Sequence, residues 1–288
     1  MSCGGRKTGN ASFFIVERIR FIMNIIDAHC HVPYKERDLH PTLGVEFTRA
    51  ALRRNMQAHD IDAVVSPTSY SPQWNDGPLI REHDLANWDT NIHFLLGINP
   101  LQCSEGGNEG IERARKLMLD GTVKGLKVYL GYYHVAVTDE RYMRFFALAN
   151  ELKRPVMLHT GDTHYKTGKL RYSHPLVVDD IAVDFPDARF VIAHLGNPWT
   201  VDAAAVVYKN ANVFTDLSGM FIGSQMPPSL RRQVQEAYEY VDNPTKFMFG
   251  TDWPVCEVGP YIEEFKRTIP ERDHGLFFRE NALNVYDL

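Results

Sequence analysis

Short apolar runs rich in β-branched residues alternate with amphipathic stretches along the chain from residue 24 onward. Apolar positions at helical spacing mark the amphipathic stretches, whereas the short runs between them are typical of buried strands. In the stretch 139–153, Met143, Phe146 and Asn150 recur on one helical face, and Asp139 lies at an acidic start. The pattern predicts strands over 24–29, 61–66, 92–97, 123–130, 155–160, 189–194, 211–216 and 246–251. It predicts helices over 46–59, 79–90, 109–120, 139–153, 175–185, 199–209, 228–241 and 275–286.

Strict alternation of strands and helices is typical of a parallel sheet in the α/β class. Eight such units favour a closed (β/α)8 TIM barrel, with a doubly wound open sheet as the alternative. The sequence has no internal repeat or linker, and its 288 residues suit one large domain. We therefore expect a single barrel domain over residues 23–288. Residues 1–22 contain a short apolar run that Glu17 and Arg18 interrupt, so we expect a dispensable N-terminal extension.

The composition excludes several classes of function. A formal net charge of −5 gives no sign of a nucleic acid or membrane-surface partner, which leaves a small-molecule substrate and a possible homo-oligomer. No apolar run approaches the length of about 18 residues needed to span a bilayer. The four cysteines lack CxxC pairs, so we expect reduced thiols in a cytoplasmic protein.

Histidines and an aspartate end several of the predicted strands. In a barrel, the C-terminal ends of the strands form the active site. The first strand ends in His29 and His31, whose side chains share one face while Cys30 points to the other. Strands five, six and eight end in His159, His194 and Asp252. Neutral imidazole suits Zn, Fe, Ni or Cu far better than Mg or Ca, so this edge of the sheet is a candidate transition-metal site.

Other polar residues have less certain roles. Lys127 is flanked by apolar strand residues, where a free ammonium would be costly to bury. Three roles are open for it: a carbamate that bridges two metals, a partner of a substrate carboxylate, or a structural role. Lys169 and Arg171 lie in a basic loop after strand five and are candidates to bind a substrate carboxylate, against the alternative of a solvated loop. Asp27 is expected to accept a hydrogen bond from a ligand imidazole. His40 follows no predicted strand and is expected to be solvated or packed.

Taken together, five motifs resemble the amidohydrolase superfamily and, within it, the amidohydrolase-2 group of metal-dependent TIM-barrel hydrolases. They are Asp27-Ala28-His29-Cys30-His31, Gly125-Leu126-Lys127, Leu158-His159-Thr160-Gly161, Ala193-His194-Leu195-Gly196 and Gly250-Thr251-Asp252-Trp253-Pro254. The resemblance covers roughly residue 24 to the end of the chain. It implies that His29, His31, His159 and Asp252 hold a divalent metal, zinc first, with Mn, Fe or Ni as alternatives. It also implies one or two ions per chain, with His194 either a ligand of a second metal or the residue that positions the attacking water.

The reaction that this resemblance implies is hydrolysis of a lactone, amide or ester by a metal-activated water, with Asp252 and His194 as catalytic residues. Lys127 would bridge two metals only if carbamylated. A decarboxylase on the same metal ligands is the first alternative, since related enzymes cleave C–C bonds. A catalytically silent barrel that serves as a binding protein is the second.

Overall fold

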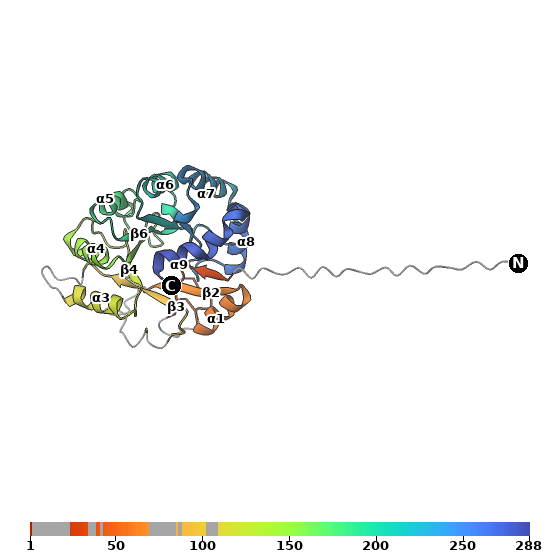
Figure 1. Ribbon diagram of the computed structural model, residues 1–288, viewed down its shortest axis with the longest axis horizontal. Helices are drawn as coiled ribbons and strands as arrows, with labels where there is room; N and C mark the ends of the chain where they lie inside the picture. The colour runs from red at the N-terminus through yellow and green to blue at the C-terminus, as the bar shows by residue number, and fades with distance from the viewer. Residues whose placement is uncertain (2–23, 34–38, 41–42, 69–84, 86–87, 102–108) are drawn as a thin grey trace.

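The computed structural model describes residues 1, 24–33, 39–40, 43–68, 85, 88–101 and 109–288 (Figure 1). Within them, eight parallel strands form one sheet in chain order. These are β1 (Ile25–Asp27), β2 (Ile61–Pro67), β3 (Ile92–Ile98), β4 (Gly125–Val128), β5 (Pro155–Leu158), β6 (Arg189–Ile192), β7 (Val213–Asp216) and β8 (Phe247–Met248). Each overlaps a predicted strand, and most end earlier than predicted.

Backbone hydrogen bonds between the segments after β8 and β1 close this sheet into a barrel. They run from Ala28 N to Phe249 O at 2.9 Å, from Asp252 N to His29 O at 2.7 Å, and from His31 N to Trp253 O at 2.8 Å. Residues 28–31 and 249–253 are therefore the seam of the barrel. The closed (β/α)8 TIM barrel predicted from the sequence is confirmed, as is its organisation as a single domain.

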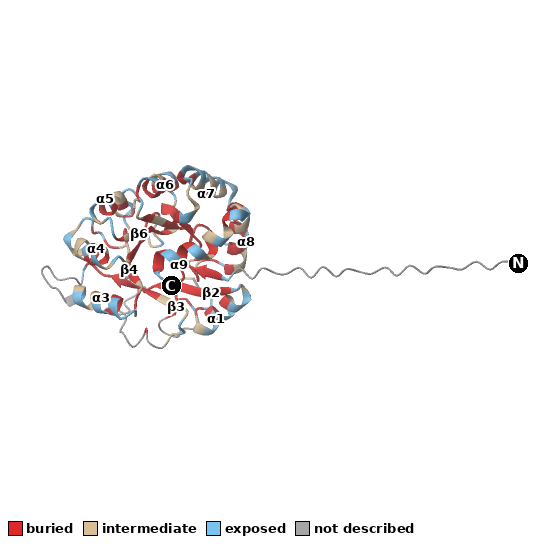
Figure 2. Cartoon of the chain, in the orientation of Figure 1, coloured by how far each residue is buried: buried red, intermediate tan, exposed pale blue. Residues whose placement is uncertain are grey.

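Helices surround the sheet, with their apolar faces against it and their polar faces toward solvent (Figure 2). They are α1 (Arg49–Ala58), α3 (Glu109–Leu119), α4 (Glu140–Leu152), α5 (Val177–Asp184), α6 (Thr200–Lys209), α7 (Pro228–Val241), α8 (Val258–Thr268) and α9 (Asn281–Tyr286). The side chains of Thr48 and Asp139 cap α1 and α4 by accepting hydrogen bonds from backbone N–H groups in the first turn. The predicted helix 79–90 falls mostly outside the described residues.

The predicted helix 275–286 is present, but helix α8, which lies between it and β8, was not predicted. Gly259-Pro260 is a typical turn dipeptide in a sequence, but in α8 it lies in the first turn, where the N–H that proline lacks has no helical partner. The segment after α8 forms a π-helical turn, Leu276–Glu280, and then α9.

The C-terminal helix α9 lies across the middle of the ring of strands (Figure 1). Its residues Ala282, Val285 and Tyr286 pack with Ile26 and Met248 in the buried cluster inside the barrel. Asp287, next to α9, is hydrogen bonded to Arg189 at the start of β6. The N-terminal ends of the strands are thus sealed by packing, which leaves the C-terminal ends for the site.

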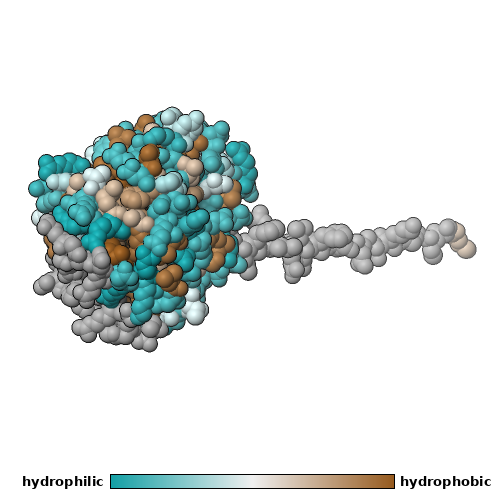
Figure 3. All heavy atoms as spheres, turned by 60° about the vertical axis from the view of Figure 1, so that its left-hand side comes forward, coloured by the Kyte–Doolittle hydropathy of each residue, from teal (hydrophilic) through white to brown (hydrophobic). Residues whose placement is uncertain are grey.

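The face shown in Figure 3 is mainly hydrophilic where it is described, with apolar side chains scattered over it. In the part of the chain that the structure describes, no helix has the length and apolar character needed to cross a membrane. Cys30 and Cys256 are free, buried thiols. Cys30 packs in the core cluster that contains the helices, as expected from its place between His29 and His31.

Candidate metal centre and cavity

The predicted site residues meet at the C-terminal ends of the strands, around a cavity of about 110 Å³. Its walls combine titratable groups with aromatic rings. The lining residues are His29, His31, His40, Leu43, Lys127, Tyr129, Tyr132, His159, His164, Tyr165, His194, Asp252, Pro254 and Val255. The structure therefore brings together all the residues predicted as metal ligands.

His29, His31 and Asp252 form one of two groups of possible metal ligands among the described residues, and the other is His29, His194 and Asp216. One ligand atom from each lies within 4.8 Å of the other two. Asp252 Oδ1 is 3.1 Å from His31 Nε2 and 3.6 Å from His29 Nε2. The seam hydrogen bonds hold these residues in place, because His29 and His31 follow β1 while Asp252 follows β8.

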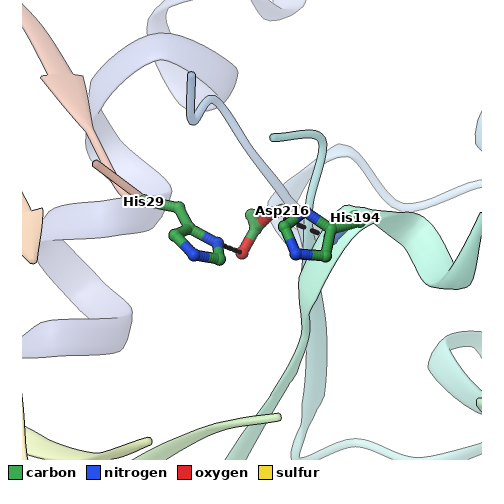
Figure 4. A group of neighbouring side chains, drawn as sticks. All are labelled: His29, His194 and Asp216. Atoms are coloured by element: carbon green, nitrogen blue, oxygen red, sulfur yellow. Dashed lines mark hydrogen bonds and ion pairs between the residues drawn. The ribbon is translucent and has the colours of Figure 1, made fainter. Parts of the chain in front are cut away.

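Asp216, at the end of β7, lies on the other side of the His29 ring, between His29 and His194 (Figure 4). Its Oδ2 atom is 3.1 Å from His29 Nδ1, and its Oδ1 accepts a hydrogen bond from the His194 backbone N–H at 3.1 Å. A carboxylate on the far nitrogen of a ligand histidine fixes the orientation of the ring and raises its basicity. This residue was missed from the sequence, although the predicted strand 211–216 ends on it.

Asp27 does not have the role that was predicted for it, and that prediction was wrong. Its carboxylate accepts hydrogen bonds from the Thr251 N–H at 2.9 Å, the Thr251 hydroxyl at 2.6 Å and the His29 N–H at 3.2 Å. It therefore ties the backbone of the first strand end to that of the eighth. Its burial raises the pKa of the Asp27 carboxyl to about 7, against the effect of these hydrogen bonds.

His159 and His194 complete the ring of imidazoles. The ring centroids of His194 lie 5.0 Å from those of both His29 and His159. His159 Nε2 is 2.9 Å from the Asp162 carbonyl oxygen, to which only an N–H can donate, so its Nδ1 carries the lone pair. The Tyr132 ring packs edge-on against His159 at 4.7 Å.

Burial sets the protonation states of these groups. It lowers the pKa of His29 to about 4 and holds the pKa of His159 well below its usual range. Burial alone would raise the pKa of Asp252, but the hydrogen bond from His31 and the nearby imidazoles hold it well below its usual range. At neutral pH His29 and His159 are thus neutral imidazoles beside an ionised Asp252 carboxylate.

Two of these residues have left-handed backbone conformations, which are rare outside glycine. The φ angles are +61° at His194 and +59° at Asp252. Strain of this kind is typical of functional sites, where surrounding contacts hold the backbone. Gly219 lies against both residues, because a Cβ there would be 2.9 Å from Asp252 Oδ2 and 3.1 Å from His194 Nδ1.

Lys127 lies in β4, and its side chain is only 1% exposed. Its Nζ is 3.4 Å from His29 Nε2 and 3.2 Å from Met157 Sδ. Burial lowers its pKa to about 8, although Asp216 and Asp252 oppose the change. Both predicted uses of the lysine, as a carbamate and as a substrate contact, remain predictions.

Three other residues depart in different ways from what the sequence indicated. Lys169 and Arg171 are exposed and do not line the cavity; the Arg171 guanidinium lies 4.6 Å from the Tyr172 ring centroid. Their role in substrate binding stays a prediction. His40 is buried and lines the cavity, so its interpretation as a packed residue missed its position in the site. No signal in the sequence marks it, because it follows no strand.

Comparison with known proteins identifies the family. The model of the Amidohydrolase family (Amidohydro_2) matches residues 26–288. The chain belongs to the amidohydrolase family. This confirms the resemblance seen in the sequence motifs and the prediction of an enzyme.

Individual relatives of this amidohydrolase are distant. The uncharacterized metal-dependent hydrolase YcfH of Escherichia coli K12 is 24% identical over 151 residues, which are 50% of this chain and 52% of YcfH. The chain thus spans about half the length of the curated relatives that it matches. Three solved structures share the fold. The uncharacterized TIM-barrel protein Bb4693 of Bordetella bronchiseptica has a TM-score of 0.71 and 19% identity, over 91% of this chain and 97% of that chain. A probable 2-pyrone-4,6-dicarboxylic acid hydrolase of Acinetobacter baumannii, with citric acid bound, has a TM-score of 0.64 and 16% identity, over 92% of this chain and 100% of that chain. The 2,6-dihydroxybenzoate decarboxylase of Rhizobium has a TM-score of 0.64 and 15% identity, over 92% of this chain and 98% of that chain.

The donor set fits the divalent metal that this amidohydrolase is expected to use. A metal binds neutral imidazole and ionised carboxylate, and these are the states that burial and hydrogen bonding impose on His29, His159 and Asp252. Nitrogen-rich donors with one carboxylate suit zinc and the later first-row metals. The ligands are thus prepared for a metal without loss of protons from the imidazoles.

Proposed function

We propose that this amidohydrolase is a metal-dependent hydrolase that acts on a lactone, amide or ester of a small substrate. The observation that carries the proposal is the convergence of His29, His31 and Asp252 at the wall of a cavity, with their ligand atoms within 4.8 Å. The name of the relative YcfH, a metal-dependent hydrolase, supports the same class. A cavity of about 110 Å³ has room for a small organic molecule.

His29, His31, His159 and Asp252 would hold the metal, for which zinc is the first choice. A bound zinc ion lowers the pKa of a coordinated water to ~7 and polarises the substrate carbonyl. The Asp252 carboxylate accepts the proton of the attacking water and delivers it to the leaving group. His194, 5.0 Å from both neighbouring rings, orients that water.

The remaining cavity walls would select the substrate. Lys127 supplies a buried amine beside His29, which pairs with a substrate carboxylate if it is not carbamylated. Tyr129, Tyr132 and Tyr165 supply an aromatic wall. Because such a wall suits a planar ring, decarboxylation of an aromatic acid on the same residues is the second candidate function.

Metal content measured on the full chain, purified without chelators, tests the metal-dependent function. We expect bound zinc, or activity restored to stripped protein by zinc or manganese, on a panel of lactones, amides and esters. About one ion per chain leaves Lys127 free for substrate, whereas about two supports the carbamate. Release of CO₂ from aromatic acids without hydrolysis of the panel would favour the decarboxylase.

The variant Asp252→Asn tests the role of the carboxylate in this reaction. Asparagine is nearly isosteric and tolerates the left-handed backbone at this position. Loss of the proton acceptor is expected to lower kcat by about 10²- to 10⁴-fold while the variant stays folded. Normal turnover by this variant would refute the mechanism.

A further inference from the structure

The hydroxyl of Ser218 lies at the meeting point of two imidazoles and a carboxylate. This fully buried residue follows β7, two positions after Asp216. Its Oγ is 2.9 Å from His29 Nδ1, 2.9 Å from His194 Nδ1 and 2.5 Å from Asp216 Oδ1. A serine hydroxyl has one proton to donate and two lone pairs, so the three contacts admit few arrangements.

The carboxylate decides where the protons lie. The Oδ1 atom of Asp216 accepts hydrogen bonds from the His194 N–H and the Ser218 N–H, both at 3.1 Å, so this oxygen is also the acceptor in its contact with the Ser218 hydroxyl. The Ser218 hydroxyl therefore donates to Asp216 and accepts from both imidazoles.

Each Nδ1 atom also faces a second atom that can only accept. His29 Nδ1 is 3.1 Å from Asp216 Oδ2, and His194 Nδ1 is 2.9 Å from the Ser218 carbonyl oxygen. A lone pair on either nitrogen would lie against these oxygens without a proton between them. Both rings consequently carry their proton on Nδ1.

We propose that Asp216 is a positioning residue that sets the tautomer of His29, while the Ser218 carbonyl oxygen sets that of His194, so that both Nε2 atoms carry lone pairs at the cavity. The inference depends on the proposed function only for the use made of these lone pairs. In this tautomer His194 accepts a hydrogen bond from water or ligates a metal, and its Nε2 cannot donate to a substrate oxygen.

The two oxygens of Asp216 face different partners, which makes the variant Asp216→Asn selective. Oδ1 accepts from the His194 N–H at 3.1 Å, the Ser218 N–H at 3.1 Å and the Ser218 hydroxyl. The amide oxygen of asparagine must take this position, and its NH₂ group must then face His29 Nδ1. A donor there forces His29 to accept, which moves the His29 proton to Nε2. His194 keeps its carbonyl partner and its Nδ1 proton.

Long-range ¹H–¹⁵N correlation spectra of the full chain test the assignment of the two histidine tautomers. The protein is labelled at its histidines and stripped of metal with a chelator, and the signals of His29 and His194 are identified by their loss in His→Gln variants at each position. In the wild type we expect the Nδ1–H tautomer for both rings near neutral pH. A predominant Nε2–H form of either ring overturns the proposal, and this measurement needs no folded Asp216 variant.

The variants then separate a hydrogen-bond reversal from a general disturbance. In Asp216→Asn we expect only His29 to switch to the Nε2–H tautomer. We also expect the zinc affinity of this variant, measured by titration of the stripped protein, to be about 10- to 100-fold lower than that of the wild type. Ser218→Ala keeps an acceptor at each Nδ1, so both tautomers should stay unchanged. Asp273→Asn, at a buried aspartate that ends the short 3-10 helix after α8 and does not line the cavity, should change neither tautomer nor affinity. An unchanged His29 tautomer in a folded Asp216→Asn variant refutes the role of Asp216, whether or not the wild type hydrolyses any substrate.

Discussion

Replacing Lys127 by methionine should stabilise the metal-free protein at neutral pH. The lysine side chain is 1% exposed, and its Nζ has contacts only with His29 Nε2 at 3.4 Å and Met157 Sδ at 3.2 Å among the hydrogen bonds of the described residues. Neither contact replaces the water that a buried ammonium loses. Methionine is an unbranched side chain of similar length, so it can occupy the same space without the charge.

The lowered pKa gives the magnitude of this effect. Burial moves the pKa of Lys127 from its usual 10.5 to about 8 in the folded protein. At ~1.4 kcal/mol per pH unit, this difference corresponds to about 3 kcal/mol of destabilisation below pH 8. Between about pH 8 and 10.5 the unfolded chain binds the proton and the folded chain does not, so the free energy of unfolding rises with pH in this window.

Denaturant unfolding of metal-free wild type and Lys127→Met, at pH 7 and above pH 10.5, measures the effect. We expect the variant to be more stable by up to about 3 kcal/mol at pH 7 and nearly equal to wild type at high pH. The exposed Lys166 offers a control, and Lys166→Met should change stability by less than about 0.5 kcal/mol at both pH values. A Lys127→Met variant less stable than wild type at pH 7 would refute the reasoning, because the ammonium would then have favourable partners.

Three further perturbations follow from the structure. Gly219→Ala places a methyl group 2.9 Å from Asp252 Oδ2 at a φ of +60°. The free energy of unfolding, measured by thermal unfolding, should fall by about 1–2 kcal/mol, and zinc titration should show a weaker affinity. An unchanged affinity would contradict the close approach. Tyr286→Ala removes a fully buried ring from the cluster inside the barrel and should cost about 3–5 kcal/mol in denaturant unfolding, which a cost below 1 kcal/mol would disprove. Deletion of residues 1–22 should leave Tm unchanged, and a chain that then fails to fold would show that the segment is needed.

Much of the fold could be predicted because the strands of a barrel are buried on both faces. Continuous apolar runs such as 190–193 therefore stand out from the amphipathic helices between them. The ends of the strands were less predictable, because residues such as His159 leave the ladder to bring their side chains over the barrel. Helix α8 was not predicted because Gly259-Pro260 is compatible with either a turn or the first turn of a helix, and the sequence pattern alone does not distinguish the two.

The convergence of His29, His31, His159, His194 and Asp252 on one cavity could be predicted because each follows a strand within a few residues, and a barrel brings the C-terminal ends of all strands together. Asp216 satisfies the same rule and could have been found by it. The contact between Asp216 and His29 could not be predicted, because it depends on the direction in which the Nδ1 atom of the His29 ring points. Asp27 was the nearer residue in sequence, but its carboxylate points to Thr251. His40 lies in a loop, where its backbone N–H donates a hydrogen bond to the Val45 carbonyl oxygen. The spacing of apolar residues does not predict a contact of this kind.

The seam has a consequence for the order in which a newly made chain becomes competent for metal. It joins segments whose residues Asp27 and Thr251 lie 224 positions apart. Synthesis delivers the N-terminal part first, so His29, His31 and His159 leave the ribosome well before residues 249–253 do. A nascent chain that stops short of the seam carries three imidazoles without Asp252 and without the backbone contacts that orient the first two. If the proposed metal site is correct, we therefore expect it to be complete only in the finished polypeptide, after the part that is made first has begun to fold.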